Sequence, residues 1–196
     1  ESGNPRQPAA MIVGRAREQV ALLALLESMR AGHGRIVLVS GEAGIGKTTL
    51  VDDLAREAER RGCLVLWGHA FDLSATPPYG PWLELLRQFP AGRDELPPLP
   101  SFLQAGHSLA EISSQDALFA TIRAFFAAVA RRQPLVLVLD DLHWADQGSL
   151  DFLRFLARQL GAHRILLVSI YRSDELHRHH PLFTLLPLVV REAGAE

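Results

Sequence analysis

The sequence GEAGIGKT at residues 41–48 fits the pattern G-x-x-x-x-G-K-[ST] at every fixed position. Glycines let the chain curl so that successive backbone N–H groups face one centre, and a helix that begins near Lys47 adds the positive end of its dipole. An oligophosphate fits such a loop, with the Lys47 ammonium between the β- and γ-phosphates and the Thr48 hydroxyl offered to Mg²⁺. The alternative is a glycine-rich turn without a ligand, which would need neither the lysine nor the hydroxyl.

The type of nucleotide follows from the glycine spacing and from the asparagine content. The residues expected to contact the phosphates are Gly41, Glu42, Ala43, Gly44, Ile45, Gly46, Lys47, Thr48 and Thr49. Glycines at 41, 44 and 46 do not fit the dinucleotide fingerprint G-x-G-x-x-G, so the loop is typical of a mononucleotide site. Guanine-selective GTPases carry an Asn-Lys-x-Asp element, and the only asparagine here is Asn4, ahead of the predicted fold. We therefore expect ATP or ADP rather than a guanine nucleotide.

Two adjacent carboxylates, Asp140 and Asp141, follow the apolar run LVLVL at residues 135–139. A buried strand that ends in two carboxylates is unfavourable unless a positive group meets them, and Mg²⁺ is the natural candidate. We expect Asp140 to hold the metal together with Thr48, and Asp141 to orient or deprotonate the attacking water. The alternative is that both side chains cap the following turn.

A third chemical group, Arg172, directly follows the apolar run RILLVSIY at residues 164–171. In a parallel sheet the ligand crevice lies outside the carboxyl ends of the strands, so Lys47, the two carboxylates and Arg172 should point into one place. There Arg172 would read the γ-phosphate or stabilise charge in the transition state. The alternative is a surface arginine paired with Asp174 or Glu175.

The elements that must position these groups alternate along the chain. The predicted strands are 35–40, 63–67, 135–139 and 164–171, and the predicted helices are 18–30, 47–60, 81–89, 115–132, 147–160 and 181–190. A capping box is predicted at Ser113 and Asp116, and Asp146 is predicted to cap the helix that follows it. This order implies an α/β fold, a parallel sheet with helices on both faces.

The composition fits one globular domain and excludes several other classes. The 196 residues are 48% hydrophobic and 21% charged, which excludes a disordered tail. A net charge of -2 argues against a protein that binds nucleic acid by coating its phosphates. The single cysteine, Cys63, and the absence of a signal-peptide pattern favour a reducing, cytoplasmic location. The longest apolar run is far shorter than the ~20 residues that a membrane helix needs.

Four segments carry a family resemblance: residues 12–15 (IVGR), 41–50 (GEAGIGKTTL), 135–146 (LVLVLDDLHWAD) and 169–176 (SIYRSDEL). Together they resemble the ATPase domain of STAND-class signal-transduction ATPases. The similarity is greatest to the bacterial type found in LuxR-like or MalT-like transcriptional regulators and in some multidomain adenylate cyclases. It spans residues 12–196, and DDLHWAD is its most specific part.

The resemblance implies a P-loop NTPase fold, a three-layer sandwich with a mostly parallel sheet in the strand order 2-3-4-1. It also implies that the 41–48 loop binds the triphosphate, that Asp140 coordinates Mg²⁺, that Asp141 is the catalytic acid and that Arg172 is a sensor. An N-terminal element of the family lies near the adenine and matches at Val13, Gly14, Arg15 and Glu18. The match fails at Ala16, where the family usually has glutamate.

Members of the family that this chain resembles act as switches. ATP favours an open form that associates, ADP favours a closed form, and hydrolysis resets the cycle. In them a fifth strand, a helical lid and further domains follow. We therefore expect residues 1–11 to be a flexible lead-in or a cloning remnant, and residues 12–196 to be an ATPase core that stops before the fifth strand and the lid. The expected partners are the nucleotide, other domains of the same longer chain and, through an exposed edge at 35–40, other copies of the chain. Neither nucleic acid nor a membrane is an expected partner.

Two other functions remain open at the level of the sequence. A small-molecule or nucleotide kinase shares the phosphate loop and fits within ~200 residues. Adjacent Asp140 and Asp141 favour water activation instead, and no arginine-rich lid between strands is evident. A nucleotide-binding interaction module without turnover is the third possibility, because affinity and hydrolysis use overlapping residues. The leading expectation is a Mg²⁺-dependent ATPase that is weak in the isolated chain.

Overall fold

The computed structural model describes residues 16–72, 78–90, 92, 95–103 and 114–193. Its helices are α1 (Ala16–Arg30), α2 (Lys47–Arg60), α3 (Gly80–Arg87), α4 (Gln115–Arg132), α5 (Gln147–Ala157) and α6 (Pro181–Ala193). Its strands are β1 (Arg35–Gly41), β2 (Leu64–His69), β3 (Leu135–Asp140) and β4 (Ile165–Arg172), and short 3₁₀ turns include η1 (Ser101–Leu103), η3 (Leu142–Trp144) and η4 (Leu160–Ala162). None of the described helices is both long and apolar enough to cross a membrane.

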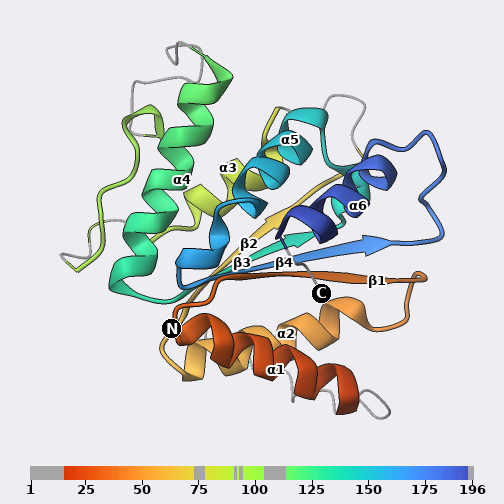
Figure 1. The fold of residues 1–196 in the computed structure, drawn as a ribbon, viewed down its shortest axis with the longest axis horizontal. Coiled ribbons are helices and arrows are strands. Elements are labelled where there is room, and N and C mark those ends of the chain that lie inside the picture. Colours follow the sequence, from red (N-terminus) through yellow and green to blue (C-terminus); the bar gives the residue numbers. More distant parts are fainter. Residues whose placement is uncertain (1–15, 73–77, 91, 93–94, 104–113, 194–196) are drawn as a thin grey trace, which may run out of the picture.

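The four strands form one parallel sheet in the order β1-β4-β3-β2. Helices α1 and α2 lie on one face of this sheet, and α3, α4, α5 and α6 lie on the other face (Figure 1). The α/β class, the three layers and the strand order 2-3-4-1 are therefore confirmed for the described residues.

Strand β3 shows why the sheet is covered on both faces. Successive side chains of a strand point to opposite faces. Leu135, Leu137 and Leu139 accordingly pack in the cluster formed with α3 to α6, and Val136 and Val138 pack in the cluster formed with α1 and α2. All six residues of the strand are buried. The uninterrupted apolar sequence is thus the pattern of a central strand.

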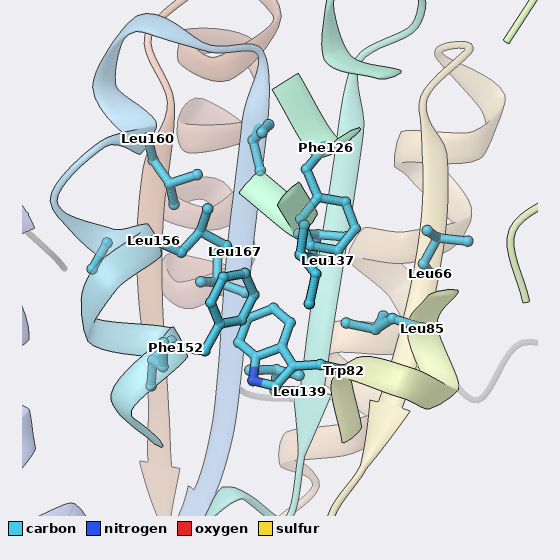
Figure 2. Packing of buried hydrophobic residues seen from close by; sticks show 14 of the residues in the cluster. Leu66, Trp82, Leu85, Phe126, Leu137, Leu139, Phe152, Leu156, Leu160 and Leu167 are labelled. Carbon is cyan, nitrogen blue, oxygen red and sulfur yellow. The ribbon is translucent and has the colours of Figure 1, made fainter. Parts of the chain in front are cut away.

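The larger of the two clusters is built around aromatic side chains (Figure 2). The Trp82 ring meets the Phe152 ring edge-on with 4.7 Å between centroids, and it also contacts Phe126. The Trp82 indole N–H donates to the Ser149 carbonyl oxygen at 3.0 Å, so its one polar atom is satisfied in the core. This bond ties α3 to α5 beneath the carboxyl ends of the strands.

The ends of two helices differ from expectation. The predicted capping box is wrong: Ser114 is the N-cap of α4, and its hydroxyl oxygen accepts from the Ala117 backbone N–H at 3.2 Å. An N-cap side chain bonds the amide three residues ahead, which places Asp116 at the second helical position beside the positive dipole end. Ser113 lies outside the described residues. The Asp146 cap of α5 is confirmed, but α5 ends at Ala157 and a 3₁₀ turn follows.

The edge strand β2 is covered by side chains of α3. Glu84 accepts the His69 backbone N–H at 2.7 Å, and Gln88 accepts the Trp67 backbone N–H at 3.1 Å. These bonds satisfy donors that a free strand edge would leave open to another chain. At the opposite edge, β1 has β4 as its one strand neighbour among the described residues.

Gly68 allows β2 and α3 to approach closely, which gives a stability prediction. A Cβ atom at Gly68 would overlap the Pro81 carbonyl oxygen, a backbone atom that cannot move without the helix. Gly68→Ala should therefore lower the free energy of unfolding by about 1–3 kcal/mol in urea denaturation. Gly161→Ala is the control, because nothing lies within 4 Å of its Cβ position. Equal destabilisation by both substitutions would contradict the close approach.

Candidate functional site

The phosphate loop connects the end of β1 to the start of α2. Gly44 and Gly46 have φ values of 73° and 85°, a left-handed conformation that side chains other than glycine rarely adopt. Gly46 is the N-cap of α2 and has no side chain that could accept from the first backbone N–H groups of the helix. These N–H groups therefore face the loop without a capping partner. These free donors and the helix dipole together favour an anion at this position.

Lys47 is the first residue of α2, and its side chain reaches back to the start of this loop. Its ammonium donates to the carbonyl oxygens of Gly41 at 2.8 Å and Glu42 at 2.7 Å, and the residue is only 7% exposed. An ammonium has three N–H donors, and two of them are used by these bonds. The loop therefore holds the positive charge in place with one donor still available for a phosphate oxygen.

Asp140, at the end of β3, faces the phosphate loop. One of its carboxylate oxygens accepts from the Thr48 hydroxyl at 3.3 Å, and the other accepts from the Asp141 backbone N–H at 2.8 Å. Asp140 is buried, and this burial raises the pKa of its carboxyl group, against the smaller opposing effect of the backbone hydrogen bond. A carboxylate and a hydroxyl are hard oxygen ligands, so this pair fits Mg²⁺, which carries charge that would offset the desolvation of Asp140.

Asp141 has an unusual backbone conformation for a residue other than glycine. Its φ is 51°, and its side chain is 42% exposed. It occupies the N-cap position of η3 but makes no side-chain cap hydrogen bond, so its carboxylate is not used for capping. Such strained residues cluster at functional sites, where the surrounding structure holds them. The turn directs the second carboxylate to the same cleft as Asp140.

Arg172, at the end of β4, combines the two arrangements that the sequence leaves open. It lines the same cleft as Lys47 and the two carboxylates. At the same time its guanidinium donates to Glu175 at 2.7 Å and lies 3.8 Å from Asp141. The arginine is thus at the site, but it is paired with a carboxylate.

A cleft of about 300 Å³ brings these groups together. Its lining residues are Ala43, Gly44, Gly46, Lys47, Thr48, Thr49, Asp140, Asp141, Ile170 and Arg172. Parallel pairing explains the convergence, because the register places Gly41 opposite Arg172 at the carboxyl ends of β1 and β4. The loop residues Gly41 and Glu42 contribute carbonyl oxygens to Lys47, and Ile45 is half exposed. The predicted adenine-side residues Val13, Gly14 and Arg15 lie outside the described residues.

Sequence reasoning missed one lining residue and the burial of another side chain. Ile170 lines the cleft because it lies two residues before Arg172, on the same face of β4, and strand alternation was the signal that could have identified it. His143 follows the two carboxylates by two residues, but nothing in the sequence shows that it is buried. Its side chain is 1% exposed beside Asp141 and Glu175.

The fold and the cleft define a P-loop NTPase. Residues 11–168 match the AAA ATPase domain family, so the chain belongs to that family. It is also 26% identical, over 192 aligned positions, to an uncharacterized protein of Rhizobium meliloti; the alignment covers 83% of this chain and 19% of that protein. The chain thus spans about a fifth of the length of that relative.

Solved structures share the fold. Cdc6p from Pyrobaculum aerophilum matches with a TM-score of 0.65 and 20% identity, over 96% of this chain and 46% of that one. The Aeropyrum pernix ORC2 protein, in its ADPNP–ADP complexes, matches with a TM-score of 0.56 and 17% identity, again over 96% and 46%. This chain therefore corresponds to about half of each of those proteins.

The burial of Asp140 predicts an effect on stability. Because the folded-state pKa is raised, the charged carboxylate destabilises the fold above that pKa, and the effect disappears below the unfolded value near 4. Without nucleotide, Asp140→Asn should raise the thermal midpoint at pH 7 by about 2 °C, and the gain should shrink as the pH falls toward 4. Asp151→Asn, at an exposed position on α5, is the control. A midpoint for Asp140→Asn that is equal to or below that of the wild type at pH 7 would contradict this effect.

Proposed function

We propose that this chain is the ATP-binding and slowly hydrolysing switch domain of a multidomain regulator of the STAND class. The observation that carries the proposal is the convergence of Lys47, Thr48, Asp140, Asp141 and Arg172 on one cleft at the carboxyl ends of the strands. The loop supplies backbone donors and one ammonium, which suit a triphosphate, and the opposite wall supplies carboxylates, which suit a metal and a water molecule.

In this proposal each residue has one task. Lys47 donates to the phosphate oxygens and remains fixed by the Gly41 and Glu42 carbonyl groups. Asp141, whose carboxylate is partly exposed, orients the attacking water and accepts its proton. Arg172 donates to the terminal phosphate and stabilises the charge that develops there.

Thr48 and Asp140 are the residues that would hold Mg²⁺. Their oxygen atoms already lie 3.3 Å apart at the wall of the cleft. Bound there, Mg²⁺ would neutralise charge on the phosphates and on the buried carboxylate. The hydrogen bond from the Asp141 backbone N–H fixes the orientation of the Asp140 carboxylate toward the loop.

The choice of ATP and of a regulator rests on two further supports. The ORC2 protein of Aeropyrum pernix, which shares the fold, is known in ADPNP–ADP complexes, and the chain lacks the Asn-Lys-x-Asp element of GTPases. The DDLHWAD segment at 140–146 is the most specific part of the STAND resemblance. Because the relatives are longer than this chain, we propose that other domains of the same protein, and other copies of it, are its partners.

The first test concerns Lys47, the only lysine of the chain. Lys47→Ala removes a charge-assisted contact with the phosphates and should weaken ATP binding by at least about tenfold in calorimetry. Arg56→Ala, a control on the exposed side of the same helix α2, should leave affinity unchanged. Full ATP affinity in a folded Lys47→Ala variant would disprove the phosphate-loop assignment.

The second test separates binding from turnover. Asp141→Asn should retain Mg²⁺-ATP binding and lose hydrolysis by about 100-fold or more, because the amide cannot accept the proton of the water. Asp140→Asn should instead weaken the Mg²⁺ dependence of binding. Phosphate release is measured with and without small-molecule acceptors, and transfer to an acceptor would favour the kinase alternative. Equal loss of binding in both variants would show that the two roles are wrongly divided.

A further inference from the structure

The guanidinium of Arg172 connects two segments that follow different strands. Its Nη1 atom donates to Glu175 Oε1 at 2.7 Å, and its Nε atom lies 3.8 Å from Asp141 Oδ1. Glu175 belongs to the segment between β4 and α6, whereas Asp141 follows β3. Arg172 lines the cleft and Glu175 does not. The arginine that would contact a ligand is therefore held by a carboxylate just outside the cleft.

A buried histidine lies next to both carboxylates. The His143 Nε2 atom is 3.3 Å from Glu175 Oε2 and 3.9 Å from Asp141 Oδ1, and its side chain is 1% exposed. Neither ring nitrogen makes a hydrogen bond with a described residue. Burial lowers the pKa of His143, against the effect of the two carboxylates, which favours a neutral ring. A buried N–H without an acceptor is unfavourable. Glu175 Oε2 is close enough to accept from His143 Nε2 but is not hydrogen-bonded to it, so a small rotation of the Glu175 side chain would supply the missing acceptor.

The segment that carries Glu175 is fastened at its far end. His180 bonds the His143 carbonyl oxygen through Nε2 at 2.9 Å, and its Nδ1 accepts the Leu182 backbone N–H at 3.1 Å. These two bonds require the proton of His180 to lie on Nε2. The segment that carries Glu175 is thus held at both ends, by Arg172 in β4 and by the bond of His180 to η3. Glu175 can therefore change partners by a side-chain rotation while the backbone of the segment stays in place.

We propose that Glu175 is a positioning residue that competes with the terminal phosphate of ATP for Arg172, and that Glu175 completes a hydrogen bond with the adjacent His143 when Arg172 leaves it. The exchange conserves hydrogen bonds. Arg172 gives up a carboxylate and gains phosphate oxygens, and Glu175 gives up a guanidinium and gains the His143 N–H. The inference rests on the proposed function, because it needs a nucleotide in the cleft.

The exchange makes binding sensitive to the γ-phosphate. A guanidinium prefers a multiply charged phosphate to a single carboxylate, and the Glu175 carboxylate repels that phosphate while it remains beside Arg172. ADP lacks the terminal phosphate and leaves the Arg172–Glu175 pair intact. Glu175 therefore sets how strongly the site distinguishes ATP from ADP.

The test compares the dissociation constants of ADP and of the non-hydrolysable analogue AMP-PNP. In Glu175→Gln, AMP-PNP should bind about two- to fivefold more tightly while ADP affinity is unchanged, because the ion pair that resists the exchange is partly exposed and weak. The ratio of the ADP dissociation constant to the AMP-PNP dissociation constant should therefore rise in Glu175→Gln. In Glu175→Asp, which keeps the carboxylate, this ratio should lie between those of the wild type and Glu175→Gln. The gain should vanish in the Arg172→Ala background, since Glu175 acts through that arginine.

The controls separate this inference from the proposed function. Glu192→Gln breaks another arginine–glutamate pair, with Arg154, outside the cleft and should leave the ratio unchanged. In the wild type, AMP-PNP but not ADP should shift the imidazole ¹⁵N resonances of His143, assigned by comparison with His143→Gln. An unchanged ratio in Glu175→Gln, or an absent shift, overturns the exchange alone. Failure of the wild-type chain to bind either nucleotide overturns the proposed function as well.

Discussion

The six residues of β3 are buried on both faces of the sheet, and this burial determines where the site can lie. A strand covered by helices on both sides can present a polar group only at its end, and Asp140 is that end. Parallel pairing then places the ends of the flanking strands at the same border, with Gly41 opposite Arg172 and His69 opposite Asp140. The phosphate loop, the carboxylates and the arginine meet because the strands between the two helical layers run in one direction.

The position of the site carries a structural cost. Lys47 and Asp140 are both nearly inaccessible to solvent, and Asp141 holds a left-handed backbone conformation that favours glycine. Each of these features would weaken an ordinary domain. They are tolerated because the Gly41 and Glu42 carbonyl oxygens solvate the ammonium, and because Thr48 and a backbone N–H solvate the carboxylate. Both charges are thus kept away from water at the border of the cleft, where each acts more strongly on a ligand than it would in bulk solvent.

The extent of helix α2 and the position of the phosphate loop were predictable because each depends on residues that lie close together in the sequence. Helix α2 occupies the predicted residues 47–60, and the phosphate loop lies where its motif predicts it. The order of the strands is not contained in any one periodic segment, and here it followed from the family resemblance. The partners of Arg172 and the burial of His143 depend on how the segments after β3 and β4 pack against each other. A glutamate three residues beyond an arginine is visible in the sequence, but the buried imidazole beside it is not.

The two borders of the sheet differ in a way that limits how copies of the chain can assemble. Glu84 and Gln88 close the outer side of β2 with side-chain acceptors, whereas β1 has a neighbour on only one side among the described residues. A sheet that can be extended at one border cannot add subunits repeatedly, because each added copy would present its closed border next. Strand pairing through β1 alone would join two copies about a two-fold axis and leave the β2 border of each copy, with its α3 acceptors, on the outside.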